Sequence, residues 1–103
     1  SYGDDMNRDE RNLYELYFKK IAIEHIRDAR IAKGWTQAQL ADAIDVSHEF
    51  VRSLESLKGK NTFSAFTAWR ISKALNVSLD DLLEFDMEQF RPIIEKAMRE
   101  KIS

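Results

Sequence analysis

Residues 36–55 read Thr-Gln-Ala-Gln-Leu-Ala-Asp-Ala-Ile-Asp-Val-Ser-His-Glu-Phe-Val-Arg-Ser-Leu-Glu, the pattern of two short helices folded against each other through a tight turn. Thr36 and Gln39 form a T-x-x-Q capping box that starts the first helix, and Ser47 is a good N-cap for the second. Ala41 is small, which lets the second helix cross close over the first. The apolar positions predicted to face inward are Leu40, Ala41, Ile44, Val46, Val51 and Leu54.

The composition favours an all-α fold. The chain has 103 residues, of which 44% are hydrophobic and 33% charged, and this is enough for one domain with a single core. Three glycines and one proline leave little turn material for a sheet. The absence of cysteine excludes disulfides and cysteine-based zinc sites. The sequence has neither a secretory signal nor a long apolar run, so we expect a soluble, cytoplasmic protein that makes no membrane contact.

Charge is unevenly distributed along the chain. The net charge is −2, but residues 19–78 carry ten basic and six acidic side chains, which is +4, and residues 1–18 and 79–103 carry −3 each. Phosphates respond to the local field within a Debye length of about 8 to 10 Å, so a basic centre is compatible with nucleic-acid binding. The acidic ends are equally consistent with ordinary solvated helix faces.

A further amphipathic helix is predicted before the central pair. Its broad apolar stripe consists of Leu13, Tyr14, Tyr17, Phe18 and Ile21. No Gly or Pro interrupts residues 4–33, which leaves open whether this stripe and a helix over about 23–33 form one unbroken helix. Gly34 supplies the stop, as a residue able to take positive φ.

Three more helices are expected after the central pair, at about residues 61–75, 78–83 and 86–101. Asn61 or Thr62 opens the first of these helices, and Ser78 with Asp81 caps the second. In the last helix, which is expected to start at Asp86, Pro92 implies a kink unless the helix begins later, with Pro92 in its first turn. The expected organisation is an N-terminal helical extension over residues 1–20, a central domain over 21–85 and a C-terminal helix over 86–103.

Three further stretches fit one pattern in order along the chain. They are Ile26-Arg27-Asp28-Ala29-Arg30, Gly34-Trp35-Thr36-Gln37, and Ile-Ser-Lys-Ala-Leu-Asn-Val-Ser-Leu-Asp-Asp-Leu-Leu over residues 71–83. With the central pair, they make the chain from about Ile23 to Leu83 resemble the phage repressor and Cro-like (XRE-type) helix-turn-helix family. The resemblance implies a five-helix DNA-binding bundle, here with extra N-terminal and C-terminal helices. The chain departs from the family at Asp45, where Gly is common, and at Phe63, where Pro is frequent.

The resemblance also implies an ion pair inside the bundle. Members of the family pair an arginine late in the first helix with a glutamate at the end of the third. Arg30 and Glu55 occupy those places in this sequence. A structural tie between these two residues is therefore expected.

The polar face of the helix over residues 47–57 is the predicted reading face, because the first residues of such a helix approach base edges in the major groove. The residues expected to read bases are His48, Glu49, Arg52 and Ser53. Residues at helix starts and in loops are expected to contact phosphates, namely Lys33, Thr36, Gln37, Ser47, Lys58, Lys60 and Asn61. The alternative is a plain solvated helix face.

The residues give no indication of catalysis, of a cofactor or of a metal. His25 and His48 have no acidic partner at metal-ligand spacing. No cysteine nucleophile, glycine-rich phosphate cradle or G-x-S-x-G turn is present. We therefore expect a protein that is not an enzyme.

The expected function is that of a sequence-specific DNA-binding transcriptional regulator, a repressor that reads an operator in double-stranded DNA. A second class of protein also fits. A protein-interaction module, such as an antitoxin or a regulator subunit, would keep the two helices as a scaffold and bind a protein partner instead. The acidic ends and Glu49 favour this second class, whereas Arg52 and the neighbouring lysines favour DNA.

A single recognition helix covers too few base pairs to select an operator from a genome, so a symmetric homodimer on a palindromic site is expected. Apolar stripes outside the central motif offer the contact surface: Leu13, Tyr14, Tyr17 and Phe18; Phe90, Ile93, Ile94, Ala97 and Met98; and Phe66 with Trp69. The alternative for the last pair is that the N-terminal helix folds back over Phe66 and Trp69 in its own chain.

Overall fold

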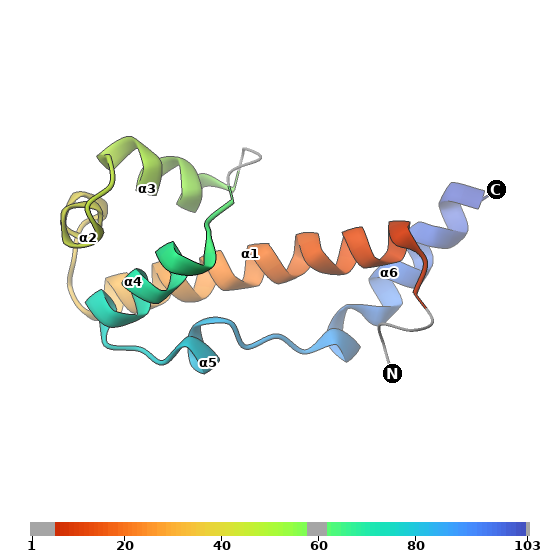
Figure 1. The fold of residues 1–103 in the computed structure, drawn as a ribbon. Helices are drawn as coiled ribbons and strands as arrows, with labels where there is room; N and C mark the ends of the chain where they lie inside the picture. The colour runs from red at the N-terminus through yellow and green to blue at the C-terminus, as the bar shows by residue number, and fades with distance from the viewer. Residues whose placement is uncertain (1–5, 58–61, 103) are drawn as a thin grey trace.

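The computed structural model describes residues 6–57 and 62–102, which contain α-helices and no strand. The all-α class is as predicted. The helices are α1 (Arg8–Ala32), α2 (Gln37–Ile44), α3 (His48–Ser56), α4 (Ala65–Leu75), α5 (Leu79–Leu82) and α6 (Met87–Ile102) (Figure 1).

The long helix α1 is the element around which the others are arranged. It packs against α3, α4, α5 and α6. Helices α2 to α5 gather around its C-terminal half, whereas α6 lies beside its N-terminal half (Figure 1). Because α1 is continuous from Arg8 to Ala32, the boundary expected between residues 20 and 21 falls inside one helix. The N-terminal extension is therefore the first part of the helix that also serves the helix-turn-helix region.

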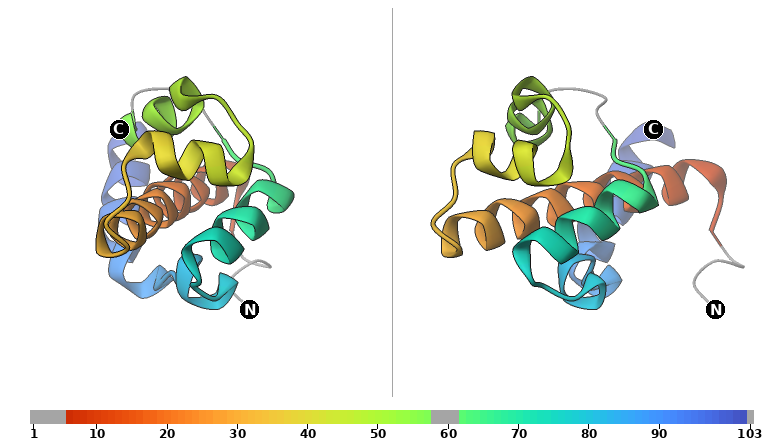
Figure 2. Two further views of the ribbon diagram at one scale, coloured as in Figure 1. Left: turned by 90° about the vertical axis from the view of Figure 1, so that its left-hand side faces the viewer. Right: turned by 60° about the vertical axis from the view of Figure 1, so that its left-hand side comes forward.

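The core lies where α1, α2, α3, α4 and α5 meet. In the views of Figure 2, as in Figure 1, α3 and α5 lie on opposite sides of α1. The core cluster joins residues from all five helices: Ile26, Leu40, Ala41, Ile44, Val51, Ile71, Leu75 and Leu82. His25 adds a polar tie, since its Nδ1 donates to the Leu82 carbonyl at 3.0 Å and so links α1 to α5.

The start of α2 and the turn between α2 and α3 have the local structure expected from the sequence. The Thr36 hydroxyl accepts from the Gln39 amide at 3.1 Å, and the Gln39 side chain accepts from the Thr36 amide at 2.8 Å, which completes the capping box. Ala41 is fully buried. Asp45 ends α2 in the left-handed conformation, with φ 59° and ψ 50°. The Ser47 hydroxyl then caps α3 by accepting from the Phe50 amide at 3.0 Å.

The left-handed backbone at Asp45 generates a prediction about stability. An L-residue pays a steric cost in this region that Gly does not pay, so Asp45→Gly should raise the free energy of unfolding by about 0.5 to 1 kcal/mol. Asp45→Ala is the matched control and should lower it, because Ala lacks the short polar group that makes Asp tolerable there. Urea unfolding of the three proteins checks the order; a Gly variant less stable than the Ala variant would contradict it.

The start of α4 differs from the sequence-based expectation, whereas the start of α6 agrees with it. Helix α4 begins after Ser64, whose hydroxyl accepts from the Thr67 amide at 3.1 Å, rather than after Asn61 or Thr62. Phe63 packs against the core cluster, and this contact places Thr62 and Phe63 in the connection before the helix. Pro92 lies inside α6, beyond its first turn, where its ring supplies no N–H for the helix ladder.

The two terminal helices bury their apolar stripes against each other. Tyr17 stacks on Phe90 with ring centroids 5.0 Å apart, and Phe85 contacts both Phe18, at 5.6 Å, and Phe90, at 5.1 Å. At the far end, Lys101 Nζ donates to Asp9 Oδ2 at 2.6 Å, and this bond holds the pKa of the Asp9 carboxyl below its usual range. Much of the surface expected to be available for dimerisation is therefore covered within one chain.

Phe66 and Trp69 are not covered by the N-terminal helix. Their exposed fractions are 65% and 46%, and the two rings stack on each other with centroids 6.1 Å apart. The alternative that the N-terminal helix folds back over this pair is wrong, because the aromatic face of that helix packs on α6 instead.

The packing of α6 on α1 predicts that two nearby residues of α6 contribute very differently to the free energy of unfolding. Phe90 is 8% exposed, so Phe90→Ala should lower the free energy of unfolding by about 2 to 4 kcal/mol. Ile93 is 48% exposed on the same helix, so Ile93→Ala should change it by less than about 0.5 kcal/mol. Chemical denaturation of both variants measures this. Similar losses from the two substitutions would show that α6 does not dock through Phe90.

Candidate nucleic-acid interface

Helix α3 presents one apolar and one polar face. Val51 and Leu54 are each 1% exposed and hold the inner face against the core. His48, Glu49 and Arg52 lie exposed on the outer face. Ser53 is half-buried at the edge. The four residues predicted to read bases thus lie in the first turns of a helix whose position is fixed by burial of its other side.

Acidic and basic side chains on this surface are engaged with each other. Arg52 Nη2 donates to a carboxylate oxygen of Glu49, one turn earlier on α3. Asp42 of α2 and Nε2 of His48 form a hydrogen bond of 2.8 Å across the turn. The i,i+3 spacing of Glu49 and Arg52 is a signal that sequence reasoning had available. The contact between Asp42 and His48, by contrast, could not be predicted from spacing, because it depends on how α2 and α3 cross.

The helix starts flanking this face retain hydrogen-bond donors. Thr36 and Ser47 both lie exposed and use a hydroxyl lone pair to accept from the backbone. A hydroxyl also carries one O–H donor, which in both residues remains for an anion such as phosphate. Lys33 lies nearby in sequence, with its Nζ 4.6 Å from the centre of the Trp35 ring. These three predicted phosphate contacts therefore border α2 and α3.

Gln37 makes a contact in the structure that the sequence did not predict. Its Nε2 donates to Glu55 Oε1 at 3.1 Å, and the residue is half-buried. This amide supports the interior ion pair, and its second N–H leaves the predicted phosphate contact open. The remaining predicted phosphate contacts, Lys58, Lys60 and Asn61, lie outside the described residues.

Arg30 and Glu55 form a bidentate ion pair that joins α1 to α3. Arg30 Nε donates to Glu55 Oε2 and Nη2 donates to Oε1, each at 2.8 Å. The third nitrogen, Nη1, donates to the Trp35 carbonyl at 2.8 Å. The two side chains are 11% and 2% exposed, so the pair is shielded from water. A buried ion pair is stable only when its remaining hydrogen-bonding groups are satisfied, and here every nitrogen of the guanidinium has an acceptor.

The described residues contain no group of three or more His, Cys, Asp and Glu side chains placed to hold a metal ion. In the same part of the chain, no helix is long and apolar enough to cross a membrane.

Comparison with known proteins identifies the class to which this fold and surface belong. A family model described as Helix-turn-helix matches residues 26–82, more than half of the chain. The chain belongs to this XRE-type helix-turn-helix family of DNA-binding transcriptional regulators.

Individual proteins that are similar to the chain include a curated relative and a solved structure. An uncharacterized HTH-type transcriptional regulator from Archaeoglobus fulgidus is 38% identical over 64 residues, which are 62% of this chain and 89% of that protein. The crystal structure of the hypothetical transcription factor NHTF from Neisseria has a TM-score of 0.59 at 22% identity, covering 72% of this chain and 83% of the other. At that identity the second likeness shows the fold alone.

The buried ion pair predicts that two glutamates of α3 contribute differently to the stability of the protein. Glu55→Ala leaves the Arg30 charge buried without its partner and should lower the free energy of unfolding by about 3 kcal/mol. Glu49→Ala breaks an exposed pair and should cost less than about 1 kcal/mol. Replacing both buried partners, as Arg30→Met with Glu55→Leu, should recover most of the loss, since no charge is then stranded.

Thermal and urea unfolding of these proteins measure the effect. A melting temperature for Glu55→Ala within a degree of the parent would show that the pair does not hold α3.

Proposed function

We propose that the protein is a sequence-specific transcriptional repressor that places α3 in the major groove of an operator. The observation that carries the proposal is the combination on α3 of a fully buried inner face with an exposed outer face carrying His48, Glu49 and Arg52. Occupation of the operator would block access of the transcription machinery. The name of the Archaeoglobus fulgidus relative, an HTH-type transcriptional regulator, supports the same class of function.

The Glu49–Arg52 pair suits base reading. Glu49 engages Nη2 of Arg52, and the guanidinium has five N–H donors, so others remain for O6 and N7 of a guanine. Glu49 itself is repelled by phosphate and accepts from the cytosine amino group. This arrangement favours discrimination among sequences over general attraction to DNA.

The repressor is proposed to act as a homodimer on a palindromic operator. Two copies related by a two-fold axis place two recognition helices about one DNA turn, roughly 34 Å, apart and double the number of base pairs read. Because the terminal helices bury their stripes against each other within one chain, the contact between copies is expected on other surfaces.

The proposal predicts how binding responds to salt and to substitution. If each subunit of a dimer neutralises about four phosphates, the slope of log K against log[salt] is near −7. Arg52→Ala and Glu49→Gln should change which base is preferred, by about 1 to 3 kcal/mol at the affected position. Lys33→Ala should weaken all sequences alike and reduce the slope by about 1 per subunit. Lys96→Ala, on α6, is the matched control and should change neither quantity.

Selection from a random duplex pool, followed by fluorescence anisotropy at several salt concentrations, makes both measurements. Equal, sequence-independent losses from the Arg52 and Glu49 variants would refute α3 as the reading face. A flat salt profile with no selected sequence would instead favour the second candidate function, a module that binds a protein partner. The exposed Phe66 and Trp69 rings are the observation that favours this second candidate function.

A further inference from the structure

Helix α4 leaves two large aromatic side chains exposed to solvent. Phe66 and Trp69 are 65% and 46% exposed, and their rings stack on each other with centroids 6.1 Å apart. Arg70 lies over the Phe66 ring at 5.7 Å, and Lys73 lies over the Trp69 ring at 5.8 Å. We call these four residues the α4 patch. Apolar residues scattered singly are normal on a protein surface, whereas adjacent exposed rings mark an interaction site.

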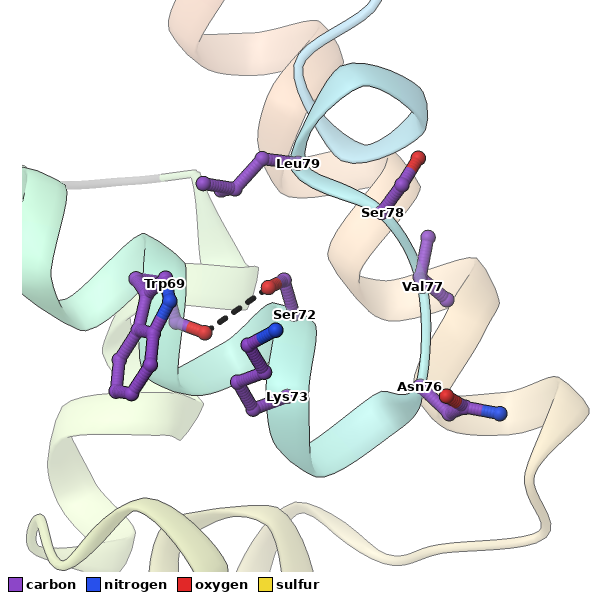
Figure 3. Close-up of a pocket in the computed structure, with 7 residues that line it drawn as sticks. All are labelled: Trp69, Ser72, Lys73, Asn76, Val77, Ser78 and Leu79. Carbon is purple, nitrogen blue, oxygen red and sulfur yellow. Dashed lines mark hydrogen bonds between the residues drawn. The ribbon is translucent and has the colours of Figure 1, made fainter.

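A hollow beside the α4 patch extends this surface toward α5. It has a volume of about 480 Å³ and lies between the two helices (Figure 3). Trp69 and Lys73 line it from α4, and Leu79 lines it from the start of α5. The remaining lining includes the hydroxyl groups of Ser72 and Ser78. The hollow can therefore receive an apolar side chain of a partner next to the Trp69 ring.

The α4 patch carries positive charge that no acid of the same helix compensates. Helix α4 contains no acidic residue. Within residues 6–57 and 62–102, neither Arg70 nor Lys73 forms an ion pair. Among the described residues that line the hollow, Lys73 has the one charged side chain. This surface is complementary to a partner that combines apolar side chains with carboxylates.

The spacing of the two cations matches the spacing of side chains on another helix. Arg70 and Lys73 are three positions apart, so their Cβ atoms are separated by about 5 to 6 Å on one side of α4. Two acids one turn apart on a partner helix have the same separation. The patch extends over about 10 Å of the helix axis, from Phe66 to Lys73. A single small carboxylate would contact only part of this length.

We propose that the α4 patch is the docking site for an acidic amphipathic helix of another protein. The carboxylates of that helix pair with Arg70 and Lys73, and its apolar residues pack on the two rings and enter the hollow. Aromatic residues and arginine are the side chains enriched at the centres of such interfaces.

Two other occupants fit the same surface less well. Single-stranded nucleic acid binds by stacking its bases on exposed rings. Each ring here already has the other ring and a cation over it, so a base would have to displace these contacts. A second copy of the α4 patch would bring Arg70 and Lys73 of both copies together, and like charges across an interface are unfavourable.

The inference does not depend on base reading by α3, because the α4 patch belongs to another helix and its ligand is measured without DNA. It names the chemistry of the partner that the second candidate function requires. A regulator that binds DNA through α3 can carry the same partner on α4.

Selection from a random library of peptides of about 16 residues, which is about four helical turns, tests the chemistry of the partner. The full chain and the double variant Phe66→Ser with Trp69→Ser are used as separate targets. Peptides selected by the parent alone should be enriched in Asp or Glu three or four positions apart, with apolar residues at helical spacing beside them. Circular dichroism of the most enriched peptide should show that its helix content rises on binding.

Fluorescence anisotropy of this peptide then tests the two cations. Arg70→Glu and Lys73→Glu should each raise its dissociation constant about tenfold, because each substitution turns an attraction into a repulsion. Lys96→Glu, on α6, is the matched control and should leave it unchanged. Each acid of the peptide is next replaced by Lys in turn, and one of these peptides should bind Lys73→Glu more tightly than it binds the parent. An unchanged melting temperature shows that a variant is folded, and the exposed Lys73 is sufficient for the test if Arg70→Glu is not.

Acidic enrichment that depends on the rings, together with the exchanged preference of Lys73→Glu, would support the proposal. A pool without acidic residues, the same pool from the double variant, or equal binding by the parent and Lys73→Glu would overturn it. Tighter binding of oligo(dT) than of any selected peptide would assign the α4 patch to nucleic acid, and sedimentation showing self-association that Trp69→Ala abolishes would assign it to a second copy. If the chain still selects an operator after any of these results, this inference fails and the DNA-binding function stands.

Discussion

The buried pair of Arg30 and Glu55 is the constraint on which the reading surface depends. One guanidinium near the end of α1 is bonded to Glu55 of α3 and to the Trp35 carbonyl before α2, and Gln37 of α2 donates to the same carboxylate. Three elements are thereby joined at a point shielded from water, where the alternative for either charge is to remain buried and unpaired. The direction of α3 relative to α1 is therefore fixed by a specific geometry, whereas apolar contacts alone would permit sliding.

The length of α1 extends this constraint to the rest of the molecule. Its C-terminal half carries Ile26 and Arg30 into the core, and its N-terminal half carries Tyr17 and Phe18 onto α6. No hinge residue separates the two halves, so the C-terminal helix and the helix-turn-helix region are connected through one rigid rod. Helix α6 packs against the first half of α1, just as α3, α4 and α5 pack against the second half (Figure 1).

The sequence predicted the features that depend on local chemistry. The capping box of Thr36 and Gln39, the cap at Ser47 and the left-handed Asp45 are decided by residues within a few positions of each other. The sequence did not predict the start of α4, because Asn61, Thr62 and Ser64 are all suitable N-cap residues. The packing of Phe63 on the core decides among them. The sequence also did not predict which element packs on each apolar stripe, because periodicity shows which side of a helix is apolar but not which element contacts that side.

The placement of charge explains how a chain of negative net charge can have a surface suited to DNA. On α3 the acid beside the arginine is bound to it, so the pair presents a nearly neutral face whose remaining donors are fixed in direction. The proposed attraction to phosphate is then left to the hydroxyls at the starts of α2 and α3 and to Lys33. Around α5 the arrangement differs: within residues 6–57 and 62–102, Lys73, Asp80 and Glu84 form no ion pair, and Lys73 lies over the Trp69 ring instead. Pairing Glu49 with Arg52 within the chain thus lowers the attraction of α3 for any phosphate and leaves directed donors, which is the arrangement that the proposed discrimination among base sequences needs.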